Sequence, residues 1–383
     1  MSDKNKKITD YIEKDIVSGE DTIWDRISVS IVAFFFIGFV FYCWFKPATD
    51  VSDVERRKLT QKPEMSVENV MSGDYMENFE NYAVDQIPFR QQFRSLKAIY
   101  STYVMGQLDN NGLVISDGYI IDMEYTLDED SLDYASQRFN HIYNKYLVDV
   151  DAHVYLSIIP DKNYYNTNEN ALSYDYEYMV EKMCDDMEYA EYIDVFDELS
   201  LADYYRTDTH WKQESIVPVA EKIAQAMGAN IETEYEHIKL EDKFYGVYYG
   251  QMALPLEGDA LYYLTNDTIE ACQVYDYENS RDISMYDMEA VSSAVPYEMY
   301  LYGPLSLITI TNPKASTDKE LIIFRDSFGS SIAPLLATGY SKVTLVDIRY
   351  ISPEYLGQFL EFDNQDVLFL YNAAVLNNSQ TIK

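Results

Sequence analysis

The chain has 383 residues, enough for a membrane anchor, a stem and one large domain or two small ones. Its 65 acidic residues outnumber 29 basic ones and give a formal charge of −36 at pH 7. Because such a surface repels phosphates, we expect no nucleic-acid partner. Cys43, Cys184 and Cys272 lack the clustered spacing of a zinc site, so we expect neither a metal nor another cofactor.

An uncharged apolar run extends from Ile27 to Phe45, between Arg26 and Lys46. As a helix rising 1.5 Å per residue it would be roughly 28 Å long, close to the thickness of a bilayer core. We therefore expect an uncleaved transmembrane helix over 27–45, preceded by a tail over 1–26. A cleaved signal peptide and a buried core helix are the alternatives. Basic residues on the two flanks are nearly balanced, so the positive-inside rule leaves the orientation open.

Residues 46–66 are polar and without periodicity, and we expect them to form a stem before a domain over 67–383. Apolar residues between 66 and 103 recur at helical spacing, and Pro88 interrupts them, which predicts two helices. A further helix is expected over 127–148, with Asp128 or Ser131 as its N-cap.

From about residue 150 onward, short apolar runs alternate with helical patterns. The expected strands are 153–159, 193–196, 305–311, 320–324, 342–347 and 366–371. The expected helices are 174–187, 213–227, 329–337 and 353–360. This alternation is typical of an α/β domain with a mostly parallel sheet. Residues 230–300 show no periodicity and are expected to be an irregular insertion.

One chemically suggestive string is Asp208-Thr209-His210-Trp211, in a chain with only four histidines. In an extended segment, residues two apart point to the same side, so either Asp208 orients the imidazole of His210 or both side chains simply face one cleft. The structural alternative is a loop histidine that caps a helix starting at Trp211-Lys212. Metal ligation is a further alternative, although the sequence offers no third ligand at a useful spacing.

The second string, Arg325-Asp326-Ser327-Phe328-Gly329, follows an expected strand and opens an expected helix. A serine at such a junction exposes its hydroxyl at the edge of the sheet, and backbone N–H groups nearby can stabilise an oxyanion. The alternative is that Asp326 and Ser327 only cap the helix. Together the two strings supply a carboxylate, an imidazole and a hydroxyl, which serine-type acyl transfer requires.

Several ordered blocks resemble the DHHW family of anchored bacterial proteins and, more distantly, the alginate O-acetyltransferases of AlgX/AlgJ type. The resemblance covers most of residues 50–375, and Thr209 stands where the name-giving motif has a second histidine. Besides the two strings above, the matching blocks are Asp85-Gln-Ile-Pro-Phe-Arg90, Ile159-Pro-Asp-Lys162, Phe244-Tyr-Gly246 and Asp347-Ile-Arg-Tyr350.

The resemblance implies an SGNH-hydrolase-like three-layer α/β/α domain preceded by one transmembrane helix. It implies a triad of Ser327 as nucleophile, His210 as base and Asp208 as the residue that orients the base. Arg325 replaces the glycine of the usual Gly-Asp-Ser block, which leaves the backbone geometry and the oxyanion donors there open. Arg325, Arg349 and Tyr350 are expected near the bound substrate, and the alternative for Arg349 and Tyr350 is a purely structural pair.

The resemblance also implies a function and an orientation. We expect a cytoplasmic tail, a single membrane crossing and a large extracytoplasmic domain that O-acetylates a cell-surface or secreted polysaccharide. The expected partners are the polysaccharide acceptor and a membrane-bound O-acyltransferase that delivers the acetyl group. The alternatives are a carbohydrate acetylesterase with the same triad and a non-catalytic polysaccharide-binding or assembly scaffold.

Overall fold

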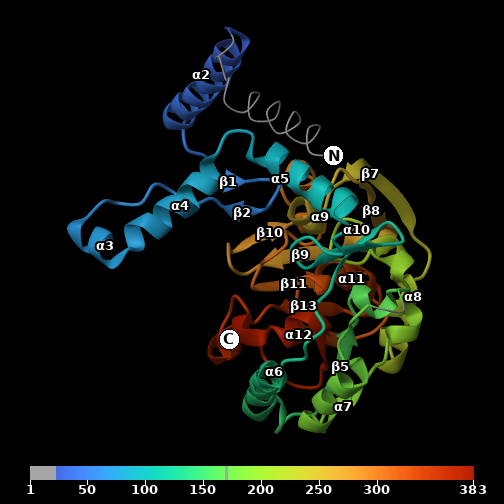
Figure 1. The fold of residues 1–383 in the computed structure, drawn as a ribbon. Coiled ribbons are helices and arrows are strands. Elements are labelled where there is room, and N and C mark those ends of the chain that lie inside the picture. Colours follow the sequence, from blue (N-terminus) through green and yellow to red (C-terminus); the bar gives the residue numbers. More distant parts are fainter. Residues whose placement is uncertain (1–22, 169–170) are drawn as a thin grey trace, which may run out of the picture. The chain divides into compact units, whose positions relative to one another are not determined.

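The computed structural model describes residues 23–168 and 171–383. The chain divides into two compact units. The first contains the described residues up to Ser52 together with Arg57–Phe93. The second contains Asp53–Arg56 and Arg94–Lys383, and it carries every strand of the large sheet (Figure 1).

The first unit begins with helix α2 (Ile23–Phe45), which is long and apolar enough to cross a membrane. It contains the expected apolar run over 27–45. The remaining elements are the paired strands β1 (Val51–Ser52) and β2 (Arg57–Lys58), the helices α3 (Val67–Ser72) and α4 (Asp74–Gln86), and the start of α5 (Arg90–Ile99). Helix α4 ends two residues before Pro88, and α5 begins two residues after it, as the proline predicts.

Asp85 of the Asp85–Arg90 block holds the first unit together. Its carboxylate accepts two hydrogen bonds from the Arg57 guanidinium, at 3.0 and 2.6 Å, and two more from the backbone and hydroxyl of Thr60. The hydrogen bonds from Arg57 lower the pKa of Asp85 well below its ordinary value. The Asp85–Arg90 block therefore links α4 to β2 and to Thr60 through Asp85.

An eight-stranded sheet forms the centre of the second unit, in the order β10-β9-β11-β13-β12-β14-β5-β6. Strands β13, β12, β14, β5 and β6 are parallel, and β11, β9 and β10 extend the sheet by antiparallel pairing. The strands are β5 (His153–Ile159), β6 (Glu191–Tyr192), β9 (Gln273–Asp276), β10 (Arg281–Ile283), β11 (Leu307–Thr311), β12 (Glu320–Arg325), β13 (Lys342–Val346) and β14 (Asp366–Asn372).

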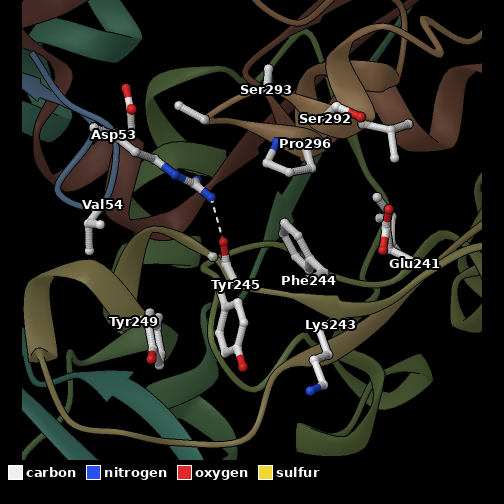
Figure 2. A pocket seen from close by; sticks show the side chains of 15 residues that line it. Asp53, Val54, Glu241, Lys243, Phe244, Tyr245, Tyr249, Ser292, Ser293 and Pro296 are labelled. Atoms are coloured by element: carbon white, nitrogen blue, oxygen red, sulfur yellow. Dashed lines mark hydrogen bonds between the residues drawn. The ribbon is translucent and has the colours of Figure 1, made fainter.

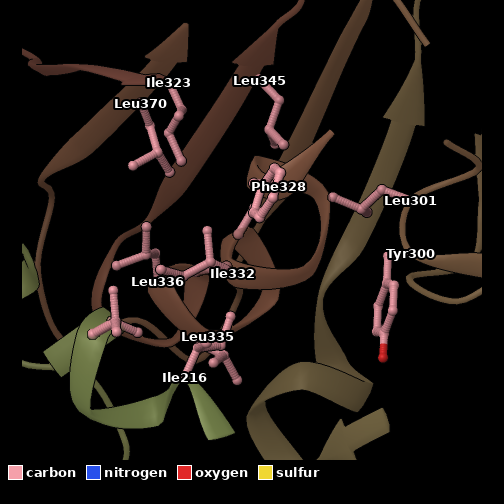
Figure 3. Close-up of a cluster of buried hydrophobic side chains, with 14 of the residues drawn as sticks. Ile216, Tyr300, Leu301, Ile323, Phe328, Ile332, Leu335, Leu336, Leu345 and Leu370 are labelled. Atoms are coloured by element: carbon pink, nitrogen blue, oxygen red, sulfur yellow. The ribbon is translucent and has the colours of Figure 1, made fainter. Parts of the chain in front are cut away.

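Helices cover both faces of this sheet, because successive side chains along each buried strand point to opposite sides. On one face, α8 (Val217–Ala226) and α11 (Phe328–Leu336) pack against residues such as Ile323 and Leu370 (Figure 3). On the other face, α6 (Glu129–Ile142), α7 (Tyr176–Asp186) and α12 (Ala373–Asn377) cover Phe324 and Phe369. The expected three-layer α/β/α fold is confirmed.

Smaller elements surround the sheet. Strands β3 (Leu113–Ser116) and β4 (Tyr119–Asp122) form one hairpin, and β7 (Glu236–Phe244) and β8 (Asp259–Thr265) form another. The short helices α9 (Val247–Met252) and α10 (Asp267–Ala271) flank β8. The segment 230–300, expected to be irregular, thus contains four strands. Register shifts interrupt β7, so its side chains do not alternate regularly, which explains the missing periodicity.

Three other expectations from the sequence differ from the structure. The helix predicted over 353–360 is a 3-10 helix over Pro353–Gln358. The strand predicted over 193–196 is replaced by β6 at 191–192, because the Asp194 carboxylate accepts a hydrogen bond from the Phe196 N–H and starts a 3-10 turn. The helix predicted over 213–227 begins with a separate 3-10 turn, Gln213–Ser215, before α8 starts at Val217.

Candidate active site

His210 lies in a tight loop whose ends are joined by the Tyr204–Trp211 bridge and by the Tyr205 N–H, which donates to the His210 carbonyl at 3.0 Å. The His210 ring is held at both nitrogens. Its Nδ1 lies 2.6 Å from Asp208 Oδ1, and its Nε2 lies 2.7 Å from Ser327 Oγ, although Ser327 is 117 residues away along the chain. Because an ionised carboxylate only accepts, Nδ1 carries the proton and Nε2 is free to accept one from Ser327.

Ser327 stands between the end of β12 and the first residue of α11, with helical backbone angles. Asp326, just before it, is buried and accepts hydrogen bonds from the N–H groups of Phe328 at 2.9 Å and Asn372 at 2.7 Å. Asp326 therefore caps the helix and ties it to the end of β14. The Ser327 hydroxyl does not serve as a cap and is directed to His210.

The Asp208 carboxylate is completely buried. Its Oδ2 accepts a hydrogen bond from the Val247 N–H at 2.9 Å and lies 3.4 Å from Nη1 of Arg56. Burial alone would raise the pKa of Asp208, but the charge and hydrogen bond of His210, together with Arg56 and the Val247 N–H, hold it well below its ordinary value. Asp208 is therefore ionised at neutral pH, as an orienting carboxylate must be.

Gly246 of the Phe244-Tyr-Gly246 block explains how Asp208 fits beside β7. A Cβ at this position would lie only 2.2 Å from the Cβ of Asp208. The neighbouring Thr207 accepts a hydrogen bond from the Gly246 N–H and donates to Asp259 at 2.7 Å, which fixes the loop that carries Asp208. The block thus provides space and anchoring for the carboxylate.

Aromatic side chains hold the His210 ring in place. The Tyr297 ring stacks on it, with 3.8 Å between centroids and 11° between planes, and Phe328 lies 4.8 Å away. Both the Tyr297 hydroxyl and the Trp211 indole N–H donate to Ser331 Oγ at 2.8 Å. Tyr297 was not found from the sequence, since it lies in a tyrosine-rich stretch with no motif around it.

Lys162, which ends the Ile159–Lys162 block, contacts the loop that carries His210. Its ammonium is buried, donates to the Tyr205 carbonyl at 3.1 Å and lies 4.8 Å from the centre of the Tyr248 ring. Burial lowers the pKa of Lys162 to about 7, against the raising effect of nearby carboxylates. Burial likewise raises the pKa of Asp161 to about 6.

Arg325 occupies a different place from the one expected. Its guanidinium is buried, lies 3.5 Å from Asp347 and donates to the carbonyls of Gly303 and Leu305 at 3.2 Å. A Cβ on Gly329 would lie 2.6 Å from the Cβ of Arg325, so the glycine makes room for the arginine. These contacts give Arg325 a structural position, without an exposed surface for a substrate.

Arg349 and Tyr350 lie beside this ion pair. Arg349 donates to both carboxylate oxygens of Asp347, at 2.8 and 2.6 Å, and its guanidinium lies 5.6 Å from the centre of the half-exposed Tyr350 ring. Within the described residues, no hydrogen bond or ring contact joins either side chain to Ser327, His210 or Asp208. The structure therefore brings together three of the six expected site residues.

A cavity of about 430 Å³ lies next to residues that contact Asp208, and Figure 2 draws the side chains that line it. Arg56 and Gly246, which both adjoin Asp208, line it together with Tyr245, Tyr249 and Pro296. Ser327 and His210 are not part of its wall, so the cavity adjoins the three hydrogen-bonded side chains without containing them. Among the described residues, no group of three histidine, cysteine or acidic side chains is arranged to hold a metal ion.

Comparisons with known proteins identify relatives by structure. No protein-family model matches the chain, and no curated protein matches it in sequence. A DHHW family protein from Eubacterium siraeum is 18% identical, with a TM-score of 0.58 over 72% of this chain and 95% of its own. Bacillus cereus PatB1 is 16% identical, with a TM-score of 0.54 over 69% of this chain and 96% of its own.

Two further structures match. PatB1 with a sulfonyl adduct gives a TM-score of 0.52 at 16% identity, over 69% of this chain and 97% of that one. The O-acetyltransferase domain of Pseudomonas putida AlgJ gives 0.42 at 12% identity, over 70% and 92%. The resemblance read from the motifs is confirmed at the level of the fold: this chain shares the fold of the DHHW family protein and of PatB1.

Proposed function

We propose that this protein is an O-acyltransferase that acetylates a cell-surface or secreted polysaccharide through a Ser327–His210–Asp208 triad. The observation that carries the proposal is the pair of short hydrogen bonds that joins the three side chains, with a buried carboxylate behind the imidazole. A serine hydroxyl is a weak nucleophile until a base accepts its proton, and here the base is already in contact with it.

The proposed reaction has two halves. Ser327 Oγ attacks the acetyl carbonyl of the donor ester while His210 Nε2 accepts the serine proton. The tetrahedral intermediate expels the donor alcohol, which takes that proton, and an acetyl ester remains on Ser327. A sugar hydroxyl then gives its proton to His210 and attacks this ester, and Ser327 leaves as the alcohol after it regains the proton.

The position of Ser327 supports this chemistry. It immediately precedes α11, whose amino end carries a partial positive charge that favours the developing oxyanion. Asp208 remains ionised and stabilises the imidazolium that forms during each half-reaction. Both effects act on the transition state, where charge separation is largest.

The N-terminal helix supports the proposed cellular setting. A large domain attached to α2 would stay at the cell surface, where its polysaccharide acceptor is found. Because acetyl-CoA is confined to the cytoplasm, we propose that a membrane-bound O-acyltransferase passes the acetyl group across the membrane to Ser327. The solved PatB1 carries a sulfonyl adduct, and sulfonyl fluorides are accordingly useful probes of Ser327.

The test uses the full-length protein in detergent with an activated acetyl ester, followed by intact-mass and peptide analysis. Wild type should gain one acetyl group on Ser327, and Ser327→Ala should gain none. Ser330→Ala is the matched control, because this serine lies three residues further on and its buried hydroxyl has no partner in the described structure. It should be acetylated like wild type.

Adding oligosaccharides to the acetylated protein then identifies the acceptor. Acetylated sugar would support the transferase, whereas release of acetate alone, with or without sugar, would favour the esterase. A folded wild type that gains no acetyl group, or acetylation that persists in Ser327→Ala, would contradict the triad and favour the scaffold.

A further inference from the structure

Residues Asp53–Arg56, expected to be part of a stem, belong to the compact unit that carries the triad. They connect β1 to β2 and are separated by only a few residues from the end of α2 at Phe45. The segment therefore joins the sequence next to the membrane helix to the body of the proposed enzyme.

Two contacts seat this segment. The Val54 carbonyl occupies the space that a side chain at residue 250 would need, since a Cβ on Gly250 would lie 1.7 Å from the Val54 oxygen. Beside it, Glu55 forms an ion pair with Arg94 at 3.4 Å. Gly250 belongs to α9, the same short helix whose first residue, Val247, donates a hydrogen bond to Asp208.

Arg56 then reaches the triad. Its backbone has a positive φ of 52°, and its side chain is only 11% exposed. Nη2 donates to the Tyr245 carbonyl at 2.8 Å, the bond drawn as a dashed line in Figure 2, and Nη1 lies 3.4 Å from Asp208 Oδ2. The planar guanidinium thus bridges a fixed backbone atom and the carboxylate, which a single ammonium does not do equally well.

We propose that Arg56 is a positioning residue for the proposed triad, holding Oδ2 of Asp208 so that Oδ1 stays on His210 Nδ1. With Oδ2 occupied by Arg56 and the Val247 N–H, the carboxylate cannot rotate away from the imidazole. The catalytic role of Arg56 rests on the proposed function. The arrangement of its side chain beside Asp208 does not depend on that function.

Other charged groups lie near Asp208 and Arg56, and the contribution of Arg56 has to be separated from theirs. Lys162 is buried, and its charge interacts with those of Asp208, Asp259 and Asp161. Glu298 is close enough to Arg56 for the two charges to interact. Among these groups, Arg56 is the one with a described ion pair to Asp208 apart from His210.

The first experiment measures how fast phenylmethylsulfonyl fluoride modifies Ser327 in the full-length protein. Arg56→Gln should slow this reaction about 10-fold to 100-fold, less than the roughly 10⁴-fold that loss of an orienting carboxylate costs in serine proteases. Arg56→Lys keeps the charge and should recover part of the rate. Lys58→Gln, which removes the same charge from an exposed side chain two residues later, should react within about twofold of wild type.

The second experiment does not depend on reactivity. With ¹⁵N-labelled histidine, the chemical shifts of His210 report which ring nitrogen carries the proton, and His210→Gln assigns the signal among the four histidines. Wild type and Lys58→Gln should show the Nδ1–H tautomer, and Arg56→Gln should lose part of it. Arg56→Lys, in which the charge is preserved, should retain more of it.

The outcomes separate the two proposals. A folded wild type that is not modified at Ser327 would reject the proposed function, and the tautomer would still decide the role of Arg56. Modification of wild type and Arg56→Gln at equal rates, or an unchanged tautomer in Arg56→Gln, would overturn the positioning role.

Discussion

His210 makes two hydrogen bonds that differ in their consequences for catalysis. In the proposed mechanism, the contact with Ser327 would be the path of the proton, whereas the contact with Asp208 would set the orientation of the ring. His210→Ala should therefore slow acylation of Ser327 by on the order of 10²–10⁴-fold or more, and Asp208→Asn should cost less. Rates of acetyl incorporation measure both, with His237→Ala, an exposed histidine on β7, as the control. Equal rates in His210→Ala and wild type would contradict the assignment.

At the scale of single residues, the sequence predicted the site residues that stand within a motif and missed those that lie outside one. Asp208, His210 and Ser327 were found because each stands in a short string with chemical meaning. Arg56 and Tyr297 approach the same site from segments without a pattern, through contacts that only the folded chain creates. Arg325 was expected near the substrate, but its guanidinium lies in a buried ion pair with Asp347.

At the scale of single elements, the 3-10 turn Gln213–Ser215 contains a partly buried carboxyl group, that of Glu214, whose ionised form is unfavourable. Burial raises the pKa of Glu214 to about 7, and its Oε2 has no hydrogen-bond partner in the described structure. Between pH 4.5 and 7 the unfolded chain therefore loses this proton first, so wild type becomes less stable as the pH rises through that window. The effect of this one group is at most about 3 kcal/mol.

Glu214→Gln keeps the shape of the side chain and removes its titration. The variant should be more stable than wild type at pH 8, by about 2 kcal/mol, and nearly equal to it at pH 4. Urea unfolding followed by tryptophan fluorescence at the two pH values measures the difference. A variant that is less stable than wild type at pH 8 would show that the carboxylate has a favourable partner.

Buried strands were the elements that the sequence predicted best. The run 153–159 coincides with β5, and the runs expected at 320–324, 342–347 and 366–371 match β12, β13 and β14 to within one residue at each end. Short turns were not predicted, such as the one that begins with the side-chain hydrogen bond of Asp194 and the backbone-bonded 3-10 turn at Gln213. The order of strands in the sheet was also beyond the sequence, because it depends on pairing between distant segments.

At the scale of the whole molecule, helix α2 is long and apolar enough to cross a membrane, and the proposed function sets the side on which the large domain would lie. We predict that protease added to intact cells digests the domain, because the proposed acceptor is outside the cytoplasm. An epitope tag at residue 383 should disappear without lysis, while a cytoplasmic marker protein stays intact. Protection of the tag until the cells are lysed would reverse the topology and remove the basis of the polysaccharide proposal.

The place of β14 has a consequence for how the chain is made. Every other strand of the sheet precedes it in the sequence, yet it lies between β12 and β5, and its Asn372 pairs with Ile159. During synthesis, the facing edges of β12 and β5 therefore have no strand to pair with until β14 has left the ribosome. A message cut short before residue 366 yields two half-sheets with open edges, and such edges invite aggregation. Quality-control proteases, rather than lost catalysis, would decide the fate of that product.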